Sequence, residues 1–183
     1  QTHTGRSEGP SVRIAADDVR LVGAGGDLTA GTATDEPTPT GTPLGTPTEE
    51  GLPEGDGPLG DDRVGVFVDG AQNVTVRNLR VAGYDVGVYG GDAAAVTVRS
   101  VTVANATRVG VRLDRVGGGV VADNTIRNAT TAVRAAGTTD LVVARNEIVG
   151  APGLGAAVAV QSDPGDGNVT VRANRLHGVG PVG

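Results

Sequence analysis

Four side chains suited to binding acidic sugars recur at a nearly constant interval along the chain. The four positions are Phe67, Tyr89, Arg112 and Arg134, at intervals of 22, 23 and 22 residues. Aromatic rings stack on sugar rings, and an arginine guanidinium binds a carboxylate through two hydrogen bonds. If each interval is one turn of a repeating structure, the four form a surface stripe that could bind an anionic glycan. The alternative is a stack in which each side chain only packs against its neighbours.

Acidic residues beside this stripe are the candidates for catalysis. Asp69 and Asp114 follow the stripe residues Phe67 and Arg112 by two positions. A glycoside hydrolase uses a pair of carboxylates, and a lyase uses a base together with a cation such as Arg112. Acidic residues also form solvated turns, so a structural role for both is the alternative.

Oxygen ligands for a metal gather in the segment 162–168. Asp163, Asp166 and Asn168 could bind calcium there, but no bidentate glutamate follows, so a widened turn is the alternative. The sequence has no Cys, no Met and only two His. Copper and zinc-thiolate sites are therefore unsupported, and we expect no cofactor apart from this weak calcium candidate.

Four asparagines begin Asn-X-Thr sequons, the acceptor pattern for N-glycosylation. They are Asn73, Asn105, Asn128 and Asn168. Glycosylation implies export, so the sequence predicts an extracellular or cell-surface location. The alternative is a repeat that reuses asparagine in its turns and threonine on its strands.

These residues are positioned by a repeat of about 22 residues, visible in two independent columns. In each repeat, three alternating runs of three to five residues are too short for helices and suit one coil of a solenoid. The composition agrees, with 31 Gly, 10 Pro, one Phe, two Tyr and no Trp. We therefore predict an all-β, three-sided parallel solenoid of about six coils. The columns are Val66, Val88, Val111, Val133 and Val158, and Leu79, Val101, Asn124, Asn146 and Asn174.

The repeat resembles the right-handed parallel β-helix superfamily, which includes pectate-lyase-like proteins and the NosD-type carbohydrate-binding and sugar-hydrolase repeats. Residues 12–25 resemble the opening coil and residues 64–179 the later coils. The resemblance implies a substrate groove on the side that carries the stripe. It also implies that Asn124, Asn146 and Asn174 form a structural ladder. A NosD-type accessory role is disfavoured because copper ligands are lacking.

One segment differs from the rest of the chain. Residues 31–62 hold eight of the 21 acidic residues and no Arg, which leaves 13 acids against 15 Arg elsewhere. The segment thus carries a charge of −8 and the remainder +2, and we expect a low-complexity surface insertion. The resulting single domain has an N-terminal tail at 1–11, a first coil at 12–30 and the remaining coils at 63–183. All basic residues are Arg, a usage that resembles haloarchaeal proteins.

The expected partners follow from charge and from the ends of the solenoid. A net charge of −6 disfavours nucleic acid, and no apolar run predicts membrane insertion. Terminal coils expose core and strand edges, so either this chain is one piece of a longer protein or its last coil is covered by another copy, and such end-to-end contacts can build a filament. The first hypothesis is an exported, non-catalytic structural or binding module, with a polysaccharide lyase or glycoside hydrolase as the alternative. The chain begins with Gln1, so we expect a removed signal or a longer parent protein.

Overall fold

The structure is a computed structural model that describes residues 3–5, 11–24, 26–30, 59, 62–150, 156–161 and 167–178. Within these ranges every regular element is a strand of three to six residues. None of the described residues forms a helix long and apolar enough to cross a membrane. Val and Thr favour extended backbone, while Gly, Asn or Asp follows many of the strands. The all-β prediction is confirmed.

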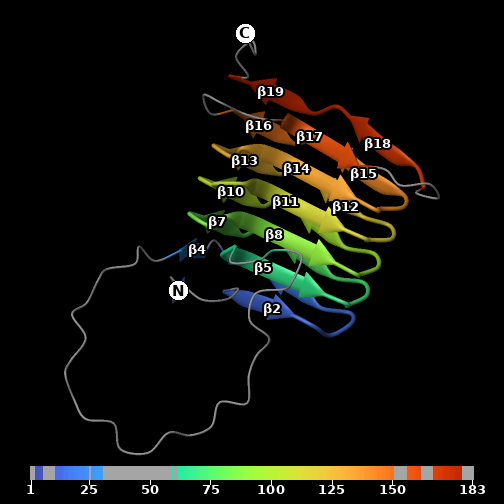
Figure 1. Ribbon diagram of the computed structural model, residues 1–183. Helices are drawn as coiled ribbons and strands as arrows, with labels where there is room; N and C mark the ends of the chain where they lie inside the picture. The colour runs from blue at the N-terminus through green and yellow to red at the C-terminus, as the bar shows by residue number, and fades with distance from the viewer. Residues whose placement is uncertain are drawn as a thin grey trace, which may run out of the picture.

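The strands stack into three parallel sheets, one for each side of a solenoid (Figure 1). Every strand pairs in parallel with the equivalent strand of the next coil. The first sheet contains β2 (Val12–Ile14), β5 (Val64–Asp69), β8 (Val86–Gly91), β11 (Val109–Asp114), β14 (Thr131–Ala136) and β17 (Ala156–Gln161). The second contains β3 (Arg20–Val22), β6 (Thr75–Arg77), β9 (Thr97–Arg99), β12 (Val120–Ala122), β15 (Leu141–Ala144) and β18 (Val169–Arg172). The third contains β1 (His3–Gly5), β4 (Asp27–Ala30), β7 (Arg80–Ala82), β10 (Thr102–Ala104), β13 (Thr125–Arg127), β16 (Glu147–Val149) and β19 (Arg175–His177).

Four coils run without a break from β5 to β16, and a less complete coil lies at either end. The first and second sheets each have six strand levels, as the prediction of about six coils requires. The number of coils described in full is lower, because the end coils include residues outside the described ranges. The acidic segment enters between β4 and β5. Apart from Leu59 and Asp62, it also lies outside the described residues.

The core is a set of vertical columns in the register that the repeat predicts. Val66 pairs with Val88, Val88 with Val111, and Val111 with Val133. All four are fully buried. Equivalent apolar columns from the second and third sheets complete the narrow interior. Each coil therefore contributes only a few side chains to the core, so the packing of each coil relies on all of them.

A column of small residues precedes this valine column because the first and third sheets approach closely. A Cβ atom on Gly65 would lie 2.4 Å from Cγ1 of Val81, and one on Gly87 would lie 2.6 Å from Cγ1 of Val103. A Cβ on Gly110 would lie 2.7 Å from Cγ2 of Ile126. The absence of a side chain thus permits the tight corner.

The turn between the second and third sheets is held by stacked asparagines. Asn124 Oδ1 accepts a hydrogen bond from the backbone N–H of Val101 at 2.9 Å, and Asn146 Oδ1 accepts one from Asn124 at 3.0 Å. Asn174 Oδ1 accepts the next, from Asn146, at 2.9 Å. Each Nδ2 also donates to a backbone carbonyl oxygen of the preceding coil. The side-chain amides thereby satisfy backbone groups that the bend leaves unpaired.

Candidate functional site

The predicted stripe is a continuous stack on the outer face of the first sheet. It begins one coil earlier than predicted, with Arg13, whose guanidinium carbon lies 5.6 Å from the centroid of the Phe67 ring. The Phe67 and Tyr89 rings are stacked, with centroids 5.0 Å apart and planes 20° apart. The Arg112 guanidinium follows, 5.8 Å from the Tyr89 centroid. Each ring face is therefore already occupied by a neighbouring ring or cation.

Tyr89 is only 1% exposed, which the alternating pattern did not predict. Its ring belongs to a second apolar cluster, outside the solenoid core, together with Leu59, Val64, Val86 and Val109. Leu59 comes from the acidic segment and is 8% exposed. The expectation of an open stripe is therefore corrected at Tyr89, which offers no free face to a sugar. The isolated Leu59 gives no periodic signal from which this cover could have been predicted.

The Tyr89 hydroxyl is buried without a hydrogen-bond partner among the described residues. Burial raises the pKa of Tyr89 to about 12, the Asp114 carboxylate adds to the rise, and the Arg112 guanidinium opposes it. The hydroxyl is therefore protonated at neutral pH. Oδ1 of Asp114 is likewise buried without a partner among these residues. A buried donor and a buried acceptor are thus both unsatisfied among the described residues.

The two candidate catalytic carboxylates are each paired with an arginine. Asp69 Oδ2 lies 2.8 Å from Arg13 Nη2. Asp114 Oδ2 lies 2.8 Å from Nε and 2.7 Å from Nη2 of Arg112. The register places Gly91 between the two acids in one column. They are thus two coils, or about 10 Å, apart, near the upper end of the range of about 6.5 to 9.5 Å in inverting glycosidases.

Other acids form ion pairs with arginines one coil away, and the sequence analysis did not identify these pairs. Arg115 Nε lies 2.6 Å from Asp92, and Arg145 Nε lies 2.7 Å from Asp123. The hydrogen bonds from these arginines hold the pKa of Asp92 and of Asp123 below the usual range. The partners are 23 and 22 residues apart, one repeat. These two ion pairs could therefore have been predicted from the spacing of their acids and arginines in the sequence.

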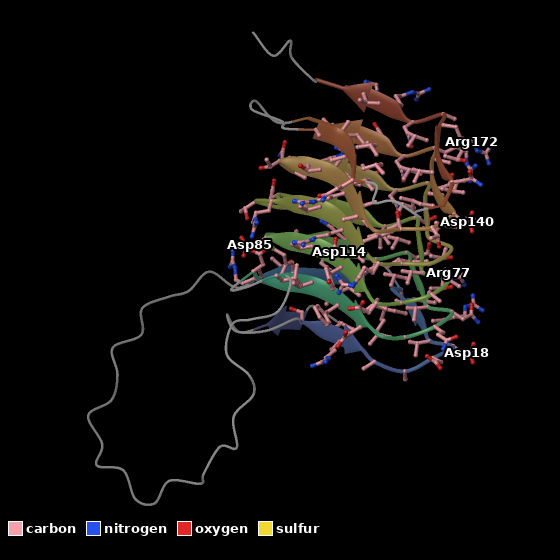
Figure 2. All side chains as sticks on the ribbon, turned by 45° about the vertical axis from the view of Figure 1, so that its right-hand side comes forward. Asp18, Arg77, Asp85, Asp114, Asp140 and Arg172 are labelled. Atoms are coloured by element: carbon pink, nitrogen blue, oxygen red, sulfur yellow. The ribbon has the colours of Figure 1, made fainter. Side chains whose placement is uncertain are left out.

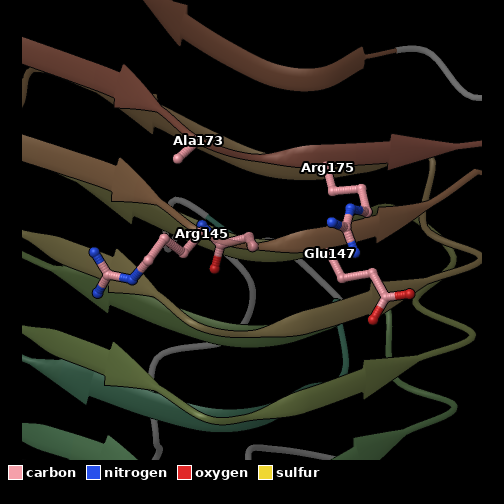
Figure 3. Close-up of a pocket in the computed structure, with 5 residues that line it drawn as sticks. Arg145, Glu147, Ala173 and Arg175 are labelled. Carbon is pink, nitrogen blue, oxygen red and sulfur yellow. The ribbon is translucent and has the colours of Figure 1, made fainter.

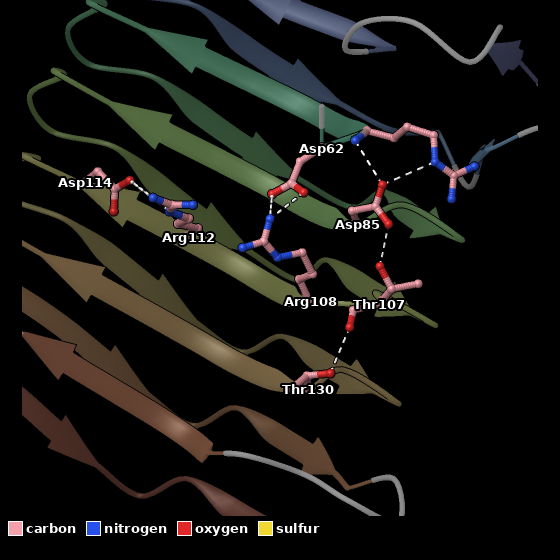
Figure 4. Close-up of polar contacts among 8 residues, drawn as sticks. Asp62, Asp85, Thr107, Arg108, Arg112, Asp114 and Thr130 are labelled. Atoms are coloured by element: carbon pink, nitrogen blue, oxygen red, sulfur yellow. Dashed lines mark hydrogen bonds and ion pairs between the residues drawn. The ribbon is translucent and has the colours of Figure 1, made fainter. Parts of the chain in front are cut away.

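The turn between the third and first sheets carries a longer polar network (Figure 4). Asp85 Oδ2 accepts hydrogen bonds from the backbone N of Arg63 at 3.0 Å and from its Nε at 3.2 Å. Thr107 donates its hydroxyl to Asp85 Oδ1. Burial would raise the pKa of Asp85, but these hydrogen bonds outweigh burial and lower the pKa. Arg108 Nη1 lies 2.6 Å from both carboxylate oxygens of Asp62.

The remaining candidates are not gathered into one site. Arg134 continues the stripe column after Arg112. Asp163 and Asp166 lie outside the described residues, and Asn168 is exposed immediately before β18. Among the residues that the structure describes, no three His, Asp or Glu side chains form a group that could hold a metal. Figure 2 shows Asp85 and Asp114 well apart on the solenoid.

All four sequon asparagines are exposed. Asn73, Asn105 and Asn128 have φ values of 51°, 56° and 53°, the left-handed region that Asn tolerates in turns. Asn128 Nδ2 donates to Asn105 Oδ1 at 3.1 Å, and Asn73 Nδ2 donates to Asp18 at 2.7 Å. The asparagines therefore have turn-forming roles, and their side chains also lie within reach of solvent.

A depression lies near the C-terminal end, lined by Arg145, Asn146, Glu147, Ala173 and Arg175 (Figure 3). Arg145 is already engaged by Asp123, and Glu147 lies 3.9 Å from His177. The lining has both charge signs and no apolar wall. It therefore lacks the convergent polar groups on an apolar surface that are typical of a small-molecule site.

Comparison with solved structures gives matches to other β-solenoids at low identity. A proposed glycosyl hydrolase from Parabacteroides merdae is 12% identical, with a TM-score of 0.61, over 95% of this chain and 80% of that chain. The catalytic domain of a GH87 α-1,3-glucanase in complex with tetrasaccharides is 16% identical, with a TM-score of 0.40, over 62% of this chain and 30% of that chain. The first match shows a shared fold.

No curated protein matches the sequence significantly. A family model described as the right-handed β-helix region matches residues 61–183, more than half of the chain. That range begins just before β5 and contains the four unbroken coils and the asparagine ladder. The chain therefore belongs to the right-handed β-helix family.

Proposed function

We propose that this chain is an exported, non-catalytic β-helix module that associates end to end with further copies of itself at the cell surface. The observation that carries the proposal is the open core of its last described coil. Val160, Val171 and Leu176 are 39%, 51% and 46% exposed. Each continues an inward column of a different sheet, so the three together form a cross-section of the core.

Burial in the preceding coil shows how unusual this exposure is. Val143 pairs with Val171 and is fully buried, and Ile148 pairs with Leu176 and is 1% exposed. The difference arises because β15 and β16 have a coil on both sides, whereas the described residues place nothing on the outer side of β18 and β19. An apolar surface bounded by strand edges is suited to pairing with another solenoid end.

The opposite end has different properties, which favours contact between unlike ends. Ile14 and Leu28 in the first coil are 5% and 7% exposed, and β1 extends the third sheet beyond that coil. The last coil carries Arg172 and Arg175 with no acid in β18 or β19. Residues 31–62, which join the first coil to the second, carry eight acids and no Arg. Charge complementarity therefore favours a head-to-tail second copy, and such contacts build filaments.

The pairing of the candidate catalytic acids supports a non-catalytic role. Asp69 and Asp114 are each held by an arginine in the same outer column. A general acid or base has to exchange a proton with substrate, and an ion pair with arginine holds a carboxylate in its charged form. The exposure of the four sequon asparagines supports export.

Sedimentation velocity over a concentration series tests the association. The expected result is concentration-dependent growth at low salt and its loss at high salt, because exposed charges are screened. Val171→Arg should abolish growth, whereas Thr170→Arg, on the outward face of the same strand, should retain it. Far-ultraviolet circular dichroism checks that both variants fold. A parent that stays monomeric at every concentration, or equal growth in both variants, would contradict the proposal.

The second candidate is a polysaccharide lyase or glycoside hydrolase that binds an anionic glycan along the stripe. The spacing of Asp69 and Asp114 in one column is the observation that favours it. Turnover of acidic polysaccharides, measured as released reducing ends or unsaturated products, should then be lost in Asp114→Asn. It should persist in Asp92→Asn, which removes an exposed ion pair one column away. Absence of turnover in the parent protein would exclude this candidate for the substrates assayed.

A further inference from the structure

The outer face of the second sheet carries arginines and no acidic residue. The six strands of this sheet contain no Asp or Glu. Val76 is fully buried in the core, so alternation turns the next residue, Arg77, outward. The same holds for Val98 and Arg99. The four arginines of the sheet are Arg20, Arg77, Arg99 and Arg172. This face therefore has positive charges without negative charges between them.

Two of these arginines are direct neighbours. Arg77 pairs with Arg99 in the strand register, one coil or about 4.8 Å away. Like charges directly opposite each other on a sheet are unfavourable. Arg20, on the preceding coil, adds a third positive charge to this region, since it pairs with Thr75 on the strand that carries Arg77. The pair therefore favours an anion placed between the two guanidinium groups.

Acidic side chains among the described residues do not neutralise the pair. Arg77 forms no ion pair within the part of the chain that the structure describes. Arg99 Nε lies 3.5 Å from Asp123 Oδ2. That carboxylate already accepts hydrogen bonds from Nε and Nη2 of Arg145, at 2.7 and 2.9 Å. One carboxylate thus faces two arginines, and the Arg77–Arg99 pair keeps an excess of positive charge.

Arg77 also has a hydrogen-bond donor that no described residue satisfies. Its Nε is buried without a partner among these residues, while the side chain as a whole is partly exposed. Figure 2 places Arg77 on the outside of the solenoid. A charged group that is partly removed from water and has no counter-ion is unfavourable. An anion held at the exposed part of this guanidinium group would lower that cost.

We propose that Arg77 and Arg99 form a binding site for a sulfate or phosphate group on the outer face of the second sheet. A guanidinium group binds such an oxyanion through two parallel hydrogen bonds. Two adjacent guanidinium groups match the double negative charge of the ligand, and the ligand removes the repulsion between them. The site lies on a different sheet from the stripe and outside the last coil. It therefore does not depend on the end-to-end contact.

Stability measurements with inorganic ions test the site. Sodium sulfate or sodium phosphate should raise the melting temperature of the parent more than sodium chloride of equal ionic strength. At about ten times the dissociation constant, binding should add about 2 to 6 °C. Sulfate and phosphate also stabilise proteins by their exclusion from the protein surface. Arg77→Gln with Arg99→Gln should keep this general effect and lose the part that comes from binding.

A second double variant controls for the loss of positive charge. Arg127→Gln with Arg134→Gln removes the same charge from the third and first sheets. Neither of these arginines forms an ion pair among the described residues. This variant should therefore retain the full response to sulfate and phosphate.

Titration calorimetry with heparin identifies the source of the bound group. A site for a group carried on a chain should bind heparin at least about ten-fold more tightly than inorganic sulfate, because several sulfates share one chain. A site for the free ion should show similar affinities for both. Either result supports the site, provided that Arg77→Gln with Arg99→Gln weakens the binding and the control variant does not.

Circular dichroism confirms that each variant folds, and Arg77→Gln alone replaces the double variant if that unfolds. The proposal is overturned if sulfate and phosphate shift the melting temperature of the parent no more than chloride does. It is also overturned if the folded Arg77 variant responds to these ions as strongly as the parent.

Discussion

Replacing Tyr89 by Phe should stabilise the protein, although it removes a polar group from the aromatic stack. The aromatic ring keeps its place between Phe67 and Arg112, while the buried, unpartnered hydroxyl is removed. A buried hydroxyl without a hydrogen bond costs about 1 to 3 kcal/mol. We therefore expect Tyr89→Phe to raise the free energy of unfolding at pH 7 by about 1 kcal/mol.

The same substitution should change the response to alkali. Burial, with a contribution from Asp114, raises the pKa of Tyr89 to about 12, against about 10 for an unfolded tyrosine. Between these values the folded state retains a proton that the unfolded state has lost. Ionisation of Tyr89 therefore leaves the free energy of unfolding unchanged below about pH 10 and lowers it by about 2 to 3 kcal/mol as the pH rises to about 12. Tyr89→Phe should lack this loss.

Urea unfolding followed by far-ultraviolet circular dichroism, from neutral pH to about pH 12, measures both effects. Tyr84→Phe is the matched control, because the Tyr84 hydroxyl is hydrogen-bonded to Ser11. That variant should lose about 1 kcal/mol at neutral pH and keep the alkaline loss caused by Tyr89. The reasoning is refuted if Tyr89→Phe is less stable than the parent at pH 7. It is also refuted if the free energy of unfolding of Tyr89→Phe falls between about pH 10 and pH 12 as much as that of the parent.

Four further substitutions test the solenoid by denaturant titration. Val111→Asp should abolish cooperative folding, because Val111 is fully buried and its charge would have no partner; a native spectrum would contradict the column assignment. Gly87→Ala should cost about 1 to 3 kcal/mol, since its Cβ would lie 2.6 Å from both the Gly110 carbonyl oxygen and Val103 Cγ1. Gly70→Ala, in open space at φ 61°, should cost only the backbone strain of about 1 kcal/mol. Asn146→Ala should cost about 2 to 4 kcal/mol, because it leaves several buried ladder groups unpaired.

The fold could be predicted because a parallel solenoid repeats one physical environment in every coil. The interval from Val66 to Val88 is one coil, and the same interval sets the pairing of Val111 with Val133. A column of identical apolar residues therefore reveals both the period and the register. A Gly or Ala before each valine of this column is visible in the sequence, but the reason why a small residue is required there is not. Only the structure brings Gly87 against Val103.

The candidate site was harder to predict because it depends on a contact without periodicity. Alternation places Tyr89 outward, and the ring does point outward from the first sheet. The cluster that buries the ring includes Leu59, which lies in a segment of low complexity and does not follow the repeat. The Arg13–Asp69 pair is similar, since 56 residues including the acidic segment separate its members. By contrast, the Asp92–Arg115 pair follows the repeat and could have been found from spacing.

The ion pairs between coils also limit where this protein can bind a partner. Asp92 and Asp123 are neutralised by Arg115 and Arg145 at a distance of one coil, so much of the lateral charge is satisfied internally. The last described coil differs, since β18 and β19 carry Arg172 and Arg175 beside the exposed apolar residues Val171 and Leu176. This end is therefore the surface at which we propose that a second copy binds. Low salt should favour associated ends and high salt separated ends, because exposed charges are screened.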